Sequence, residues 1–131
     1  MTTPFWCILI TALLPYLWST VSLRARVAQF GSFDNRLPRL EQAKLTGSGA
    51  RALGASANAF ETFPFFAASV IVAGIAGADP GWSSIWSVSY LAARILHGVF
   101  YYRDVDKLRS VAFGLGQVCC VALFVLAALA S

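Results

Sequence analysis

Charged residues are scarce in this 131-residue chain, at 12% of the sequence against about 25% in a typical soluble domain. Hydrophobic residues make up 58%, where a soluble domain has about 45–50%. The apolar residues also gather in long runs instead of being spread along the chain. This shortage of charge excludes an ordinary soluble domain and predicts an integral membrane protein.

Several motifs are absent as well. No Cys-x-x-Cys pair or His/Cys cluster is present, so no metal site is expected. Cys7, Cys119 and Cys120 lie in apolar runs and are interpreted as small buried hydrophobic residues. No Lys or Arg precedes the first apolar run, which is also too long for a cleavable signal peptide. A chain of acids or a glycine-rich filter is missing too, which argues against a proton pump or an ion channel.

Four apolar runs are long enough to span a bilayer, which takes about 20 residues in a helix. The alternating segments of about 10 residues that indicate a membrane β-barrel are not seen. The sequence therefore predicts an all-α integral membrane four-helix bundle, a single domain whose helices cover residues 4–23, 52–78, 82–102 and 107–130. The segment "LPRLEQAKL" between the first two runs could form a short additional helix.

The cations predict the orientation in the membrane, because Lys and Arg favour the cytoplasmic side. The turn "GADPGW" between the second and third runs has none. The first and third loops are therefore expected in the cytoplasm, with the lipid bilayer as partner. These loops account for the net charge of +4 without a nucleic acid partner. The absence of a signal peptide and of an endoplasmic-reticulum retention signal favours a bacterial inner membrane. The loop cations are Arg24, Arg26, Arg36, Arg39, Lys44 and Arg51 in the first loop, and Arg103, Lys107 and Arg109 in the third.

Polar side chains inside the second and third runs are the candidate functional residues. Asn58 and Glu61 share one helix face, and Arg94, His97 and Tyr101 share another. Counted from the flanking cations at about 1.5 Å per residue, Glu61 and Arg94 both lie roughly 14–15 Å deep. Asn58 and His97 form a second level at about 9–10 Å by the same reckoning. Two interpretations remain open: a structural Glu61–Arg94 ion pair, or a polar cleft that holds a ligand.

These residues carry a resemblance to a known family. The stretch "NAFETFPFF" resembles the Asn-x-x-Glu-x-x-Pro segment on the second helix of the MAPEG family, the membrane-associated proteins of eicosanoid and glutathione metabolism. The stretch "ARILHGVFYYRDVDKLRSVAFGLG" resembles the family's later segment, with Arg-x-x-His-x-x-x-Tyr followed by an arginine, an aromatic residue and a glycine. The resemblance covers about residues 51–116 and is greatest to the microsomal glutathione transferase and prostaglandin E synthase branches.

The resemblance implies a homotrimer of left-handed four-helix bundles that binds glutathione between subunits, near the cytoplasmic side. It implies catalytic roles for Arg109, which would stabilise the glutathione thiolate, and for Tyr101. An arginine at the end of the first helix would be matched by Arg24 or Arg26. The residues that would hold glutathione are Arg51, Asn58, Glu61, Arg94 and His97.

One position departs from the family pattern. Gly54 stands four residues before Asn58, where studied members carry an arginine, and Arg51 is the nearest cation upstream. The resemblance implies a membrane glutathione transferase or peroxidase acting on lipophilic electrophiles or lipid hydroperoxides. Gly54 favours the alternative of a non-catalytic membrane scaffold, or an accessory subunit of a larger membrane complex. A third alternative is a lipid- or quinone-binding protein that uses the same cleft.

Overall fold

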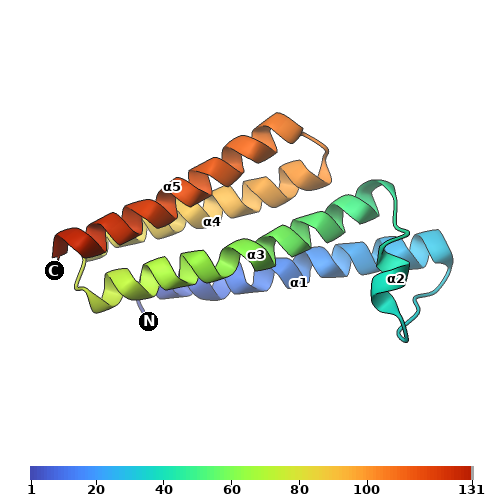
Figure 1. Ribbon diagram of the computed structural model, residues 1–131, viewed down its shortest axis with the longest axis horizontal. Coiled ribbons are helices and arrows are strands. Elements are labelled where there is room, and N and C mark those ends of the chain that lie inside the picture. Colours follow the sequence, from blue (N-terminus) through green and yellow to red (C-terminus); the bar gives the residue numbers. More distant parts are fainter. Residues whose placement is uncertain (131) are drawn as a thin grey trace.

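The computed structural model describes residues 1–130 and places them in five helices, with no strand in this range (Figure 1). The fifth helix is the short α2, which lies in the first loop within the segment "LPRLEQAKL", where the sequence indicated a possible short helix besides the four long ones. The first helix also continues seven residues beyond the predicted limit at 23. The helices are α1 Thr3–Phe30, α2 Pro38–Gln42, α3 Gly47–Ile75, α4 Pro80–Tyr102 and α5 Asp106–Ala130.

Three of the four long helices are long and apolar enough to cross a membrane: α1, α3 and α5. The chain is therefore an integral membrane protein. The α4 helix is not among them, because it carries four serines, an arginine and a histidine.

Proline and glycine mark the helix ends. A proline stands in the first turn of α1, α2 and α4, where a missing backbone N–H leaves no hydrogen bond unmade. Asp79 caps α4 by accepting a 2.8 Å hydrogen bond from the backbone N–H of Trp82. Gly31 ends α1 at a φ of 80°, a left-handed conformation that favours glycine.

The core of the bundle is built on two stacked aromatic rings. Phe66 of α3 and Tyr90 of α4 are fully buried, with ring centroids 3.8 Å apart. The Tyr90 hydroxyl donates to the carbonyl of Thr62, 3.3 Å away. The three cysteines are buried, as predicted, and all of them belong to this core cluster.

The long helices form two pairs, α1 with α3 and α4 with α5, and α3 also contacts both members of the second pair. Figure 1 shows the two pairs diverging toward the end of the bundle where α1 and α4 finish and α3 and α5 start. We call this end the loop side. The candidate functional residues lie in its half of the bundle.

Candidate functional site

An open cleft of about 270 Å³ lies between α3, α4 and α5 on the loop side. Four of the seven predicted site residues meet there. They are Asn58 from α3, His97 and Tyr101 from α4, and Arg109 from α5; Ser110 and Phe113 complete the lining.

The spacing along α4 and α5 explains why these side chains meet. His97 and Tyr101 are four residues apart, as are Arg109 and Phe113, and this spacing places each pair on one helix face. The His97 ring meets the Tyr101 ring edge-on, with centroids 5.8 Å apart. It lies 6.1 Å from the Phe113 ring. Aromatic rings therefore form much of the cleft wall.

Arg109 is held at the cleft by a cation–π contact. Its guanidinium carbon lies 4.5 Å from the centroid of the Tyr101 ring. An arginine over a tyrosine face within about 6 Å is attracted by the ring quadrupole. The Arg109 side chain is only partly buried, so its charge remains available to an anion in the cleft.

The Tyr101 ring in turn lies against Gly54 on α3. A Cβ atom at position 54 would be 2.5 Å from the Tyr101 Oη atom and 2.7 Å from its Cζ atom. Only glycine fits so close an approach of a ring to a helix backbone. The tyrosine thus occupies the space beside the position where the resemblance implies an arginine.

Arg94 lies behind Asn58 and does not line the cleft. Its side chain is buried, and its Nη2 atom donates a 2.7 Å hydrogen bond to the Asn58 Oδ1 atom. Because this bond uses the amide oxygen, the Asn58 Nδ2 group is left to donate to another partner.

Two buried nitrogen atoms near the cleft have no hydrogen-bond partner within residues 1–130: Arg94 Nη1 and His97 Nδ1. A buried polar atom without a partner costs about 1–3 kcal/mol. His97 lines the cleft, so a polar group bound there could satisfy its ring nitrogen.

Glu61 lies away from the cleft. Its side chain is exposed, and the only ion pairs within residues 1–130 are Arg26–Glu41 and Arg51–Asp104. The Glu61–Arg94 ion pair suggested by their matched depths is therefore not formed. At about 100° per residue, Glu61 faces almost opposite to the buried stripe of α3 that contacts the other helices.

Arg51 is also outside the cleft lining. Its Nε atom donates a 2.9 Å hydrogen bond to the Tyr102 carbonyl, at the end of α4. Its Nη1 atom lies 4.0 Å from a carboxylate oxygen of Asp104. The guanidinium therefore joins the start of α3 to the α4–α5 turn.

The two arginines at the end of α1 have different surroundings. Arg26 is buried, and its Nη2 atom lies 2.7 Å from the Glu41 carboxylate. Arg24 is exposed and lines a separate groove with Trp18 and Tyr102. Only Arg24 is thus available to a group outside its own chain.

Comparison with known protein families identifies the family to which this chain belongs. The model of the MAPEG family matches residues 3–129. The chain belongs to the MAPEG family. MAPEG proteins act in eicosanoid and glutathione metabolism in membranes, and the family generally uses glutathione. A search among characterised proteins finds no significant match.

Sequence reasoning did not assign two lining residues of this MAPEG chain, Ser110 and Phe113. Phe113 had a detectable signal, because it follows Arg109 by four residues and must share its helix face. Ser110 had none, since a lone serine at the start of an apolar helix is common.

Proposed function

We propose that the cleft binds glutathione, and that the protein is a membrane glutathione transferase or peroxidase acting on lipophilic electrophiles or lipid hydroperoxides. One observation carries the proposal: Asn58, His97, Tyr101 and Arg109, from three helices, line a single cleft. Membership of the MAPEG family supports glutathione as the ligand.

The positive charge of Arg109, which lines the cleft, would stabilise a thiolate. A cysteine thiol has a pKa near 8.5, and a neighbouring cation lowers it. Arg109, positioned by the Tyr101 ring, would stabilise the glutathione sulfur as its anion. That sulfur could attack an electrophilic carbon to form a thioether, either displacing a leaving group from that carbon or adding to an activated double bond. Alternatively, it could attack a hydroperoxide oxygen, releasing an alcohol and leaving a sulfenic acid that a second glutathione converts to disulfide and water.

The uncharged polar groups would orient the peptide part of glutathione. Asn58, His97 and Ser110 line the cleft, and the Asn58 Nδ2 group and the buried His97 Nδ1 atom have no partner in the described chain. Peptide amides and carboxylates supply matching donors and acceptors.

The exposure of the Glu61 side chain supports a homotrimer that binds glutathione between subunits. A charged side chain facing lipid at the depth estimated for Glu61 costs about 3 kcal/mol, and Glu61 is exposed on a single chain. A neighbouring copy would cover it and bring it to that copy's glutathione ammonium group. Arg24, exposed on the same side of the membrane as the cleft, is the better match for the family's first-helix arginine.

We propose that α4 also spans the membrane, as a fourth membrane helix. Its 23 residues reach about 34 Å, enough to cross the hydrocarbon core. Arg94 and His97 lower its hydropathy, but both are buried inside the bundle and away from lipid. With four spans, both loops on the loop side lie on one face, which we assign to the cytoplasm of a bacterial inner membrane.

A thermal-shift titration with glutathione in detergent tests the proposal. Millimolar glutathione should raise the unfolding temperature of the wild type, because a ligand that binds only the folded state stabilises it. The shift should be smaller in Glu61→Gln and unchanged in Asp106→Asn, which removes an exposed acid at the start of α5. If glutathione leaves the wild type unchanged, the proposed ligand is wrong.

One observation favours the scaffold alternative. Two positions upstream of Asn58 are candidates for a ligand-binding cation, and neither is free: Tyr101 fills the space beside Gly54, and Arg51 is bonded to the Tyr102 carbonyl. A scaffold would co-purify with a larger membrane partner in mild detergent and show no response to glutathione. A glutathione response without such a partner would exclude it.

A further inference from the structure

The first loop carries an exposed amphipathic surface with no role in the cleft. It combines large apolar side chains with cations between α1 and α3. Phe33, Leu37 and Leu40 are 49%, 57% and 60% exposed. A group of exposed apolar side chains marks a contact with a membrane or another molecule. We call this surface the loop patch and define it by Phe33, Arg36, Leu37, Arg39, Leu40 and Lys44.

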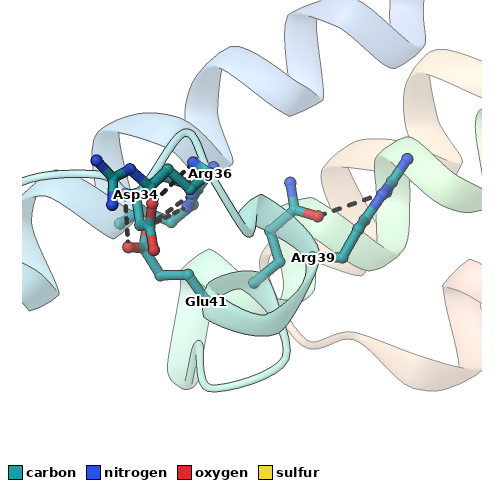
Figure 2. Close-up of polar contacts among 6 residues, drawn as sticks. Asp34, Arg36, Arg39 and Glu41 are labelled. Atoms are coloured by element: carbon teal, nitrogen blue, oxygen red, sulfur yellow. Dashed lines mark hydrogen bonds and ion pairs between the residues drawn. The ribbon is translucent and has the colours of Figure 1, made fainter.

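The loop patch is held in a fixed shape by a polar cluster (Figure 2). Arg26 donates from Nε to Glu41 Oε1 at 2.8 Å and from Nη2 to the Asp34 carbonyl at 3.4 Å. The second Glu41 oxygen accepts a 2.7 Å hydrogen bond from the Asp34 backbone N–H. The loop between α1 and α2 is thereby closed onto the end of α1.

These bonds also fix the depth of the loop patch. Asp34 and Glu41 lie level with Arg26, which follows Leu23, the last residue of the uncharged first run, by three positions. Three residues of helix span about 4–5 Å. In Figure 1, α2 accordingly lies beside the last turns of α1 and not beyond its end. We therefore expect the patch at the level of the lipid headgroups.

The charge of this segment is strongly positive. Five cations stand against two carboxylates between positions 24 and 44. Glu41 is paired with Arg26. Within residues 1–130, Arg36, Arg39 and Lys44 form no ion pair. Arg39 extends away from the Asp34–Glu41 cluster (Figure 2). The one side-chain hydrogen bond of its guanidinium within residues 1–130 runs from Nη1 to the uncharged Gln42 side chain.

From this geometry we propose that the loop patch binds anionic phospholipid headgroups of the surrounding leaflet. Phe33, Leu37 and Leu40 insert at the boundary between headgroups and acyl chains, and the three cations contact lipid phosphates. Apolar insertion combined with basic residues is the usual physical basis of interfacial binding to anionic membranes. Each cation near such a surface strengthens binding about fivefold.

A fluorophore on the loop patch tests the proposal. Leu37→Cys would carry an environment-sensitive label, since the native cysteines are buried and react poorly. The labelled protein is placed in bilayer discs of phosphatidylcholine with increasing phosphatidylglycerol, and quenching by a phosphatidylglycerol-borne quencher is measured. Quenching should rise with the phosphatidylglycerol fraction beyond the random-mixing level. Arg36→Gln should require about five times more phosphatidylglycerol for half-maximal quenching.

A matched variant separates the loop patch from the general charge of the protein. Arg103→Gln with Lys107→Gln removes two exposed cations, one in the α4–α5 turn and one in the first turn of α5, and should leave the quenching curve unchanged. Random-mixing quenching in the parent would overturn the proposal. A label shielded from lipid quenchers, with strong energy transfer between labelled copies, would overturn it in favour of a protein contact.

Discussion

Replacement of Gly54 by alanine tests how the cleft is assembled. The added methyl group would be 2.5 Å from Tyr101 Oη and 2.8 Å from its Cε1 atom. The ring cannot easily move aside, because the Arg109 guanidinium covers one face and His97 meets the ring edge-on. Gly54→Ala should therefore displace Tyr101 or force α3 and α4 apart.

Two opposing free-energy changes decide the outcome. Overpacking of a rigid site costs about 1–3 kcal/mol. Replacing a helical glycine by alanine gains about 0.5–1 kcal/mol. Gly54→Ala should thus lower the free energy of unfolding by about 0–2.5 kcal/mol. Gly114→Ala is the matched control, since its new methyl group would meet no atom within 4 Å. It should therefore only raise the free energy of unfolding, by about 0.5–1 kcal/mol.

A double-mutant cycle measured by reversible unfolding in mixed detergent provides the assay. With the ring removed by Tyr101→Ala, the Gly54→Ala change should become stabilising, by about 0.5–1 kcal/mol. If Gly54→Ala stabilises the protein as much as Gly114→Ala while Tyr101 is present, the Tyr101 ring does not restrict position 54.

Two further perturbations address the buried arginines. Asn58→Leu removes the acceptor of the buried Arg94 guanidinium and should lower the free energy of unfolding by about 1.5–3 kcal/mol, whereas Asn58→Leu combined with Arg94→Met should recover most of that loss. A loss that persists in the double variant would contradict the assigned bond. Glu41→Gln weakens the hold of Arg26 on the first loop and should raise tryptic cleavage at Arg36 at least about fivefold. Unchanged cleavage would show that the loop is held in another way.

The order of the helices, and the relative levels of Asn58 and His97 along them, could be predicted from sequence. Apolar runs of sufficient length indicate spans, and helical spacing correctly placed His97 and Tyr101 on one face of α4. Counting along each helix also put Asn58 level with His97, and both line the same cleft.

The rotation of each helix about its axis could not be predicted. Depth alone made Glu61 and Arg94 neighbours, but α3 turns Glu61 outward, and Arg94 contacts Asn58 instead. The contact of Gly54 with Tyr101 joins residues far apart in the chain, and no local pattern signals it. The bond from Arg51 to the Tyr102 carbonyl depends on the α4–α5 turn in the same way.

Arg109 is proposed to stabilise a glutathione thiolate in this cleft. Titration of the purified protein with glutathione, followed by ultraviolet absorbance of the thiolate across pH, tests it most directly. We expect a thiolate pKa below its free value for the wild type and for Arg103→Ala, which removes an exposed cation six residues before Arg109, in the α4–α5 turn. In Arg109→Ala the pKa should return toward the free value. An unshifted thiolate pKa in the wild type, or a shift that survives in Arg109→Ala, would contradict this role of Arg109.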